Sequence, residues 1–230
     1  MITFEQAATE RAAAVRTHAD RPTQRRSDEF GHPHVTRSLP SAMQIREADT
    51  GSGKLAFSGH ASVYETGYEM WDLYGPYTEI VSAGAAAESL ARGDLDVPLV
   101  LDHDPMRRIA STVNGSLQLS EDEIGLLTIA PELDPEDLDV RYIYPKMRAG
   151  LIYEMSFRFR ILSGQWSPDY TEYRINAFDI HRGDVSIVGY GANPHTTSEL
   201  RTDVPIIGER KPRPRGVDLI HEFDTFPRAI

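Results

Sequence analysis

Hydrophobic and polar residues alternate through the middle of the chain, most regularly in GLIYEMSFRFRIL, residues Gly150–Leu162. A period of two predicts a strand with one buried and one exposed face. The apolar face is expected to carry Met155, Phe157, Phe159 and Ile161. The other face is expected to carry Ser156, Arg158 and Arg160. A small hydroxyl then shares a strip with two cations, which fits either a solvated face or a nucleophile beside groups that bind negative charge.

Further strand patterns fill the region between about Ser41 and Leu200. We expect strands in Ala42–Asp49, Lys54–Tyr64, YTEIV and Asp96–Asp104, and a hairpin-like pair formed by IASTVNGSLQLSED and GLLTIAPEL. A loop rich in Tyr and Gly is expected from Glu65 to Pro76. The segment TEYRINAFDIHRGDVSIVGYGANP predicts one or two closing strands.

Helical patterns are fewer. A short helix is expected over Ala83–Arg92, and a second over Pro135–Arg148, which has acidic residues in its first turn and Gly150 as a stop. Strands therefore outnumber helices. The patterns together predict an α+β fold that is mainly antiparallel β, a β-barrel with helices packed outside it.

Both ends of the chain differ in composition from the middle. Phe4–His18 is expected to form a short helix, but the stretch that follows it mixes Arg, Pro, Ser and His with few apolar residues. Such a composition buries too little surface to order itself, so residues 1–40 are interpreted as a mobile arm. GERKPRPRG makes residues 201–230 a flexible, Pro/Arg-rich tail. Residues 41–200 remain as the folded domain.

Composition narrows the range of functions. The chain has 230 residues, a net charge of −11 and no cysteine. An acidic chain is a poor general binder of nucleic acid, because phosphate contacts need a basic surface. Without cysteine there is no disulfide, thiolate metal site or cysteine nucleophile, which suits a reducing cytoplasm. No apolar run is long enough for a membrane helix, and the N-terminus lacks the apolar core of a secretory signal.

Among the histidines, His103 has the most informative position. It lies near the end of VPLVLDHDP, where an apolar strand becomes a turn. Its ring would therefore lie at the rim of the core with one nitrogen reachable. Such a position suits a general base, although a turn histidine bonded by Asp102 or Asp104 is the simpler alternative. These three residues would make a poor metal site, since neighbouring strand residues point in opposite directions. We expect neither a metal nor a cofactor.

Ser156 and Asp184 are further candidates. Ser156 as a nucleophile needs a base within hydrogen-bond reach and donors for the developing oxyanion, which Arg158 and Arg160 could help to supply. Asp184, at the start of an apolar strand in HRGDVSIVG, could orient a histidine, and His181 is a rival for that role. Each residue taken alone also fits an ordinary structural position.

The order of the motifs is more specific than any one of them. GHASVYE, EIVSAGAAAESL, VPLVLDHDP, EIGLLTIAPEL, MRAGLIYEMSFRFRI and FDIHRGDVSIVGYGANPHT follow one another between Leu55 and Thr197. This series resembles the prohead maturation proteases of tailed bacteriophages, which are related to the herpesvirus assembly proteases. The resemblance implies a serine endopeptidase whose fold is a β-barrel surrounded by helices.

The resemblance also implies roles for individual residues. His103 would be the general base and Ser156 the nucleophile, while Asp184 stands where the family usually has Glu. His181 stays the rival third member, because the herpesvirus enzymes use a second histidine. Residues around Ser156 depart from the family pattern, so a catalytically inactive relative that serves as an assembly factor is the main alternative. An unrelated β-barrel binding module is the second.

Partners follow from the same resemblance. The implied substrates are a scaffold protein and the scaffolding segment of the major capsid protein, and the enzyme commonly cuts itself. Cleavage would take place inside the immature capsid in the host bacterial cytoplasm. The herpesvirus relatives pair, so a homodimer is also implied.

Overall fold

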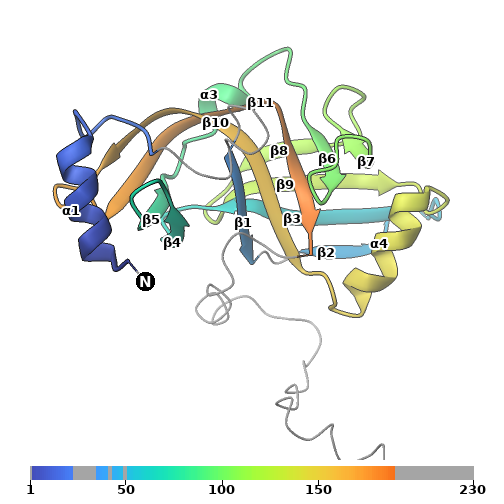
Figure 1. The fold of residues 1–230 in the computed structure, drawn as a ribbon. Coiled ribbons are helices and arrows are strands. Elements are labelled where there is room, and N and C mark those ends of the chain that lie inside the picture. The colour runs from blue at the N-terminus through green and yellow to red at the C-terminus, as the bar shows by residue number, and fades with distance from the viewer. Residues whose placement is uncertain (1, 23–34, 41–42, 49–50, 190–230) are drawn as a thin grey trace, which may run out of the picture. The chain divides into compact units, whose positions relative to one another are not determined.

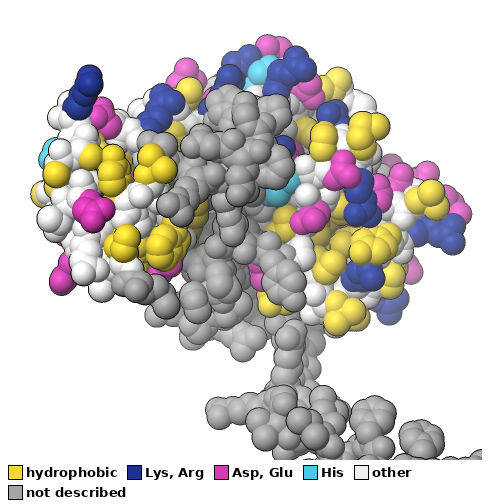
Figure 2. Space-filling view, in the orientation of Figure 1, with side chains coloured by type: hydrophobic (Ala, Val, Ile, Leu, Met, Phe, Trp, Pro, Cys, Tyr) yellow, Lys and Arg dark blue, Asp and Glu magenta, His cyan; other side chains and the backbone are white. Residues whose placement is uncertain are grey.

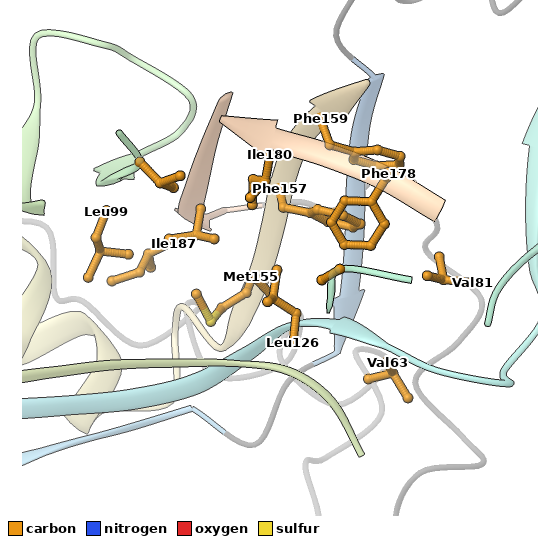
Figure 3. Packing of buried hydrophobic residues seen from close by; sticks show 14 of the residues in the cluster. Val63, Val81, Leu99, Leu126, Met155, Phe157, Phe159, Phe178, Ile180 and Ile187 are labelled. Carbon is orange, nitrogen blue, oxygen red and sulfur yellow. The ribbon is translucent and has the colours of Figure 1, made fainter. Parts of the chain in front are cut away.

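Two long strands, β10 (Glu154–Trp166) and β11 (Glu172–Val188), form an antiparallel hairpin that organises the larger of two sheets (Figure 1). The computed structural model describes residues 2–22, 35–40, 43–48 and 51–189. As the alternation predicts, Met155, Phe157, Phe159 and Ile161 are all buried. Phe157 stacks on Phe159, and both rings pack against Phe178 of β11 (Figure 3).

The larger sheet extends on both sides of this hairpin. Its order is β1-β10-β11-β5-β4, and β6 joins it by pairing with β11 and with β7. The added strands are β1 (Val35–Pro40), β4 (Tyr68–Trp71), β5 (Pro76–Val81), β6 (Pro98–Leu101) and β7 (Arg108–Ser111). β5 and β6 run parallel to β11, and the other pairings in this sheet are antiparallel.

The smaller sheet has four antiparallel strands in the order β2-β3-β9-β8. They are β2 (Gln44–Glu47), β3 (Leu55–Val63), β8 (Gln118–Glu121) and β9 (Gly125–Leu133). Leu126 of β9 and Met155 of β10 belong to one buried apolar cluster, so the core forms between the two sheets (Figure 3). The expected barrel is wrong for the described residues, whose strands form two separate sheets rather than one closed barrel. Alternation shows which residues face a core but not whether two sheets join at their edges.

Three helices lie in the described part of the chain: α1 (Phe4–Ala14), α3 (Ala87–Leu90) and α4 (Leu138–Arg148). Asp137 caps α4 by accepting hydrogen bonds from the backbone N–H groups of Asp139 and Val140. Gly150 follows the helix with a positive φ of 66°, a conformation that favours glycine after a helix end. Acidic cap and glycine stop both agree with the sequence pattern.

Several elements differ from the sequence expectation. The expected loop from Glu65 to Pro76 contains β4. One strand, β11, forms the closing segment, within the one or two expected, but Asp184 lies inside this strand rather than at its start. Within the expected hairpin-like pair, β8 pairs with β9, whereas β7 joins β6 in the other sheet. Local patterns identify strands, but their partners depend on long-range packing.

The N-terminal residues are more ordered than their composition indicates. α1 packs beside β5, and the Arg11 side chain is fully buried. Beyond the helix, backbone N–H and indole N–H of Trp166 donate hydrogen bonds to the carbonyl oxygens of His18 and Asp20. The short helix expected within Phe4–His18 is present as α1, and residues 2–22 contact the sheet, whereas the mobile arm expected over residues 1–40 stays a prediction. The expected tail, residues 201–230, lies outside the described residues.

The surface carries charges of both signs. On the face shown in Figure 2, acidic and basic side chains are interspersed with hydrophobic ones. Among the described helices, none is long and apolar enough to cross a membrane.

Candidate active site

The register of β10 and β11 puts four polar side chains on one face of the larger sheet. Ser156 lies opposite Ser186, and Arg158 lies opposite Asp184. Residues directly opposite each other in an antiparallel pair share a face, and so do residues two apart along a strand. Ser156 and Ser186 are almost completely buried, while Asp184 is 6% exposed. This face therefore holds a hydroxyl pair and a carboxylate in a position shielded from solvent.

His103 reaches the same face from β6. Leu101 at the end of β6 pairs with Ile187 of β11, and the N–H of Asp102 donates to the carbonyl oxygen of Ile187. The chain then turns sharply, because Asp102 and His103 both have positive φ, 53° and 57°. That region costs a non-glycine residue roughly 1–2 kcal/mol, although Asp and His enter it more readily than most. Strained backbone of this kind is often found where a side chain must be held in one direction.

Two hydrogen bonds hold His103 at the end of this turn. Its backbone N–H donates to Oγ of Ser186 over 2.9 Å. Its ring Nδ1 lies 2.6 Å from Oδ1 of Asp184, and both side chains are largely buried. An ionised carboxylate can only accept, so Nδ1 is the nitrogen that carries the proton. Asp184 thus fixes both the orientation and the tautomer of the ring.

The second ring nitrogen of His103, Nε2, takes no part in the contact with Asp184. With the proton on Nδ1, neutral imidazole has its lone pair on Nε2. This atom is buried and has no hydrogen-bond partner among the described residues. A buried polar atom without a partner is uncommon and needs a functional or structural reason. Since His103 binds Asp184 on the face that also carries Ser156, imidazole and serine hydroxyl lie on the same side of the sheet.

The two arginines occupy different environments. Nη1 of Arg158 lies 3.7 Å from Oδ2 of Asp184, and the side chain is 26% exposed. Arg160 instead binds Asp179, with Nη2 2.5 Å from Oδ2. Arg158 therefore borders the His103–Asp184 pair, whereas Arg160 is engaged two residues further along β10.

Asp179 is an ionised partner for Arg160. Burial tends to raise the pKa of its carboxyl, but hydrogen bonds from the His181 N–H, the Ser89 hydroxyl and Arg160 outweigh burial and lower the pKa below 3.8. A carboxyl whose pKa is lower in the folded state stabilises the fold at higher pH and loses that contribution as pH falls through its folded pKa.

Acidification below pH 3.8 is therefore expected to weaken the Arg160–Asp179 pair. The Asp179→Asn variant should show a smaller loss of thermal stability than the wild type over that pH range, because it has no charge to lose there. Thermal unfolding followed by circular dichroism at a series of pH values measures the difference. Parallel pH profiles for the two chains would contradict the role given to Asp179.

His181, the rival third member, is directed elsewhere. Its Nδ1 accepts a hydrogen bond from the backbone N–H of Asp96 over 3.2 Å. The register of β10 and β11 shifts between Arg158 and Arg160, so residues 180–183 of β11 form an irregular stretch. The described contacts bring His103 to Asp184 and not to His181.

Two residues of this site had no role in the sequence-based expectations. Ser186 holds the His103 backbone, and Gly183 allows β11 to approach β10, since a Cβ atom at Gly183 would meet the Arg158 carbonyl oxygen at 1.8 Å. The signal for Ser186 was present, because it lies two residues from Asp184 on the same strand face. The sequence carried no comparable signal for Gly183, because the irregular stretch of β11 depends on long-range pairing.

Gly183→Ala is expected to destabilise the pairing of β11 with β10 and to change the surroundings of the His103 ring beside Asp184, because the added methyl group collides with backbone that cannot rotate away. Thermal unfolding and the pH dependence of His103 ring signals in NMR measure the two effects. The matched variant is Gly115→Ala, where the added methyl group would meet no other atom within 4 Å and only the positive φ of 75° opposes it, so that the loss of stability should be modest. Equal behaviour of the two variants would contradict the close packing at Gly183.

This arrangement can support nucleophilic catalysis. It combines a histidine with a fixed tautomer, a carboxylate that stabilises the charged ring and a buried serine on the same face. No cluster of three or more His, Asp or Glu side chains able to hold a metal ion occurs among the described residues.

Comparisons with known proteins bear on the family of the chain. No curated protein sequence matches the chain. The solved structure of the bacteriophage T4 capsid assembly protease is similar at 12% identity with a TM-score of 0.40, over 66% of this chain and 96% of that one. The sequence pattern of the Caudovirus prohead serine proteases matches residues 41–204, which include His103, Ser156 and Asp184. Because that match covers more than half of the 230 residues, the chain belongs to the Caudovirus prohead serine protease family.

Proposed function

We propose that this prohead serine protease cuts peptide bonds with Ser156 as nucleophile, His103 as general base and Asp184 as the residue that orients His103. One observation carries the assignment. His103 is bound to Asp184 through Nδ1 at 2.6 Å, while its buried Nε2 has no partner among the described residues and lies on the sheet face of Ser156.

The reaction follows from these positions. Nε2 of His103 takes the proton of the Ser156 hydroxyl as its oxygen attacks the peptide carbonyl, and Asp184 stabilises the imidazolium that results. The tetrahedral intermediate collapses as the imidazolium gives its proton to the leaving amine, so the C–N bond breaks and an ester to Ser156 remains. Water, activated by His103, then attacks the ester and releases the new carboxyl end.

Arg158 is the candidate for charge stabilisation in this reaction. It is half-buried beside Asp184, whereas Arg160 is bound to Asp179. A cation near the carbonyl oxygen can stabilise the developing oxyanion directly or through water, and loss of one such donor costs about 10²–10³-fold in rate. Arg158→Ala is expected to fall in that range, measured as kcat on a peptide substrate. Arg160→Ala serves as the comparison and should affect stability more than rate; the opposite order would contradict the assignment.

The proposed substrates are proteins of the immature capsid. We extend the family assignment to cleavage of a scaffold protein or of the scaffolding segment of the major capsid protein, inside the prohead in the host cytoplasm, and to cleavage of the enzyme itself. Resemblance to the family supports these substrates. The homodimer that the resemblance implies stays a prediction.

Co-expression with the neighbouring major capsid protein tests this function. Wild type, Ser156→Ala and His103→Ala are compared by intact mass under conditions in which shells assemble. Shortening of the capsid chain or of the enzyme with wild type alone is the expected result. Equal masses in all three would favour an assembly factor without protease activity, the alternative motivated by the unusual residues around Ser156. Labelling of Ser156 by a fluorophosphonate separates these two outcomes on the purified chain.

A further inference from the structure

β1 is an edge strand that pairs with β10, the strand that carries Ser156. Its six residues pair antiparallel with β10 from Phe159 to Glu154 without any shift in register. Ser38 lies directly opposite Ser156. Because β1 is the last strand on that side of the sheet, β10 would become the edge strand if β1 were absent (Figure 1).

An open edge at β10 would bind an extended polypeptide. The N–H and C=O groups of an edge strand pair with any extended chain, largely regardless of its sequence. A chain paired with this edge would run directly alongside Ser156, with its backbone held in the extended form that a protease needs in order to present a peptide bond. β1 itself is such a chain, bound in this way.

We infer that the edge of β10 is the binding site for the extended substrate chain and that β1 occupies this site as a tethered competitor. The inference rests on the proposed protease function. It names an interaction surface, the backbone of residues 154–159, and a partner, an extended segment of a substrate protein.

The anchoring of β1 fits displacement. In its sheet β1 pairs with β10 alone, whereas β10 also pairs with β11 over its whole length. β1 ends in Pro40, which has no N–H to donate. β1 also contacts β3 of the smaller sheet, so a substrate that displaces β1 must offset the loss of these contacts as well as of the pairing with β10. The contact between Phe157 and Phe178 joins β10 and β11 and does not involve β1.

Tethering sets how strongly a substrate must bind. A segment joined to its site by a short linker is present at an effective concentration in the millimolar range. A substrate therefore has to be abundant, or to bind more tightly than β1, before it gains access to Ser156. The substrate concentration for half-maximal cleavage should then be higher than it would be without β1.

A reversible crosslink tests the inference, because the chain has no cysteine of its own. Pro40 lies opposite Glu154, and Cα atoms in such pairs are about 4.5–5.5 Å apart, within the range of a disulfide. The full-length double variant Pro40→Cys/Glu154→Cys is compared in oxidised and reduced form. Oxidation is expected to slow capsid-protein cleavage by about tenfold or more, since the tethered strand can no longer leave. The single variant Pro40→Cys should not respond to oxidation.

Cleavage by the oxidised form at the rate of the reduced form would overturn the inference, and so would failure of the disulfide to form. A second measurement does not depend on catalysis. In a Ser156→Ala background, binding of a labelled peptide that copies residues 31–44 is followed by fluorescence anisotropy. The reduced form should bind it and the oxidised form should not. If the wild type cuts no substrate, the proposed function fails, and the binding result still decides the role of the edge.

A pair of proline variants tests the inference without a crosslink. The N–H groups of an edge strand point alternately toward its partner and away from it. One of Arg37→Pro and Ser38→Pro therefore removes a bond to β10, and the other is its matched control. The first should bind the peptide more tightly and cut substrate faster, because its own strand competes less well. Equal binding and equal rates in both variants and the wild type would overturn the inference.

Discussion

Asp184→Asn is expected to lower kcat for peptide cleavage by about 10⁴-fold, the size of the effect of the equivalent change in well-studied serine proteases. An amide at this position donates as well as accepts. If its N–H₂ group faces His103, Nδ1 becomes the acceptor and the proton moves to Nε2. The nitrogen that should take the Ser156 proton would then already carry one. The geometry can persist while the tautomer is wrong, so the loss should fall on kcat more than on KM.

Labelling by a fluorophosphonate and steady-state cleavage of a peptide measure this loss. The molecule contains a matched control, the second His–Asp pair, in which Nε2 of His60 lies 2.8 Å from Oδ2 of Asp122. Asp122→Asn removes a carboxylate of the same kind in the turn between β8 and β9 of the smaller sheet, which has no contact with the His103–Asp184 pair among the described hydrogen bonds, and should leave kcat nearly unchanged. A loss of less than about tenfold in Asp184→Asn would show that another group orients His103, and His181 would then be examined first.

Asp184→Glu tests the length of this side chain separately from its charge. The resemblance described above implies a longer carboxylate at this position, but Asp184 already lies 2.6 Å from His103. An extra methylene group must therefore push the ring or bend its own chain. Activity between that of the wild type and that of Asp184→Asn is expected, measured by the same two assays. Full wild-type activity would show that the turn at His103 adapts to either length.

The strand of Ser156 illustrates what the sequence could predict. Alternation in β10 indicated the buried set around Phe157 and placed Ser156 on the opposite, polar face. The prediction that this second face is exposed is wrong at Ser156, which is 1% exposed, because a period of two shows which residues share a face but not what covers it. The ends of α4 were equally readable, since an acidic cap and a following glycine act through local backbone groups. Features set by a few adjacent residues are therefore predictable.

Features set by distant segments were not. His103 meets Asp184 only because β6 runs parallel to β11 and ends at the level of Ile187, a pairing that no local pattern encodes. The irregular stretch before Asp184 also depends on pairing, and it separates His181 from the His103 ring. For the same reason the sequence could offer His181 and Asp184 as rivals but could not choose between them. The barrel was wrong because alternation is common to barrels and to pairs of sheets.

Composition could not show how the N-terminal helix is held against the sheet, because one charged residue, Arg11, replaces the missing apolar surface. Nε of Arg11 binds Oδ2 of Asp72 at 2.7 Å, and its other nitrogens donate to the carbonyl oxygens of Tyr170, Gly75 and Pro76. The guanidinium also lies over the ring of Trp166. Averages over a polar segment cannot register a single arginine whose donors are used in this way.

Arg11→Met is therefore expected to destabilise the protein by about 3–5 kcal/mol, the cost of removing one partner of a buried ion pair. Methionine fills much of the same volume, but Asp72 would stay buried with its charge unpaired, and three carbonyl oxygens would lose a donor. Urea unfolding followed by tryptophan fluorescence measures the change, and Trp166 lies beside the substituted side chain. Arg11→Lys should recover only part of the stability, since an ammonium group cannot reproduce the planar fork.

Arg92→Met is the matched control for this experiment. Arg92 also forms an ion pair with a nearby carboxylate, Asp94, but on the surface, where such a pair contributes less than about 1 kcal/mol. The double variant Arg11→Met/Asp72→Asn adds a further check, because removal of the unpaired charge should restore part of the loss. If Arg11→Met proved no more harmful than Arg92→Met, α1 would contribute little to the stability of the sheet. The mobile arm inferred from composition would then describe residues 2–22 after all.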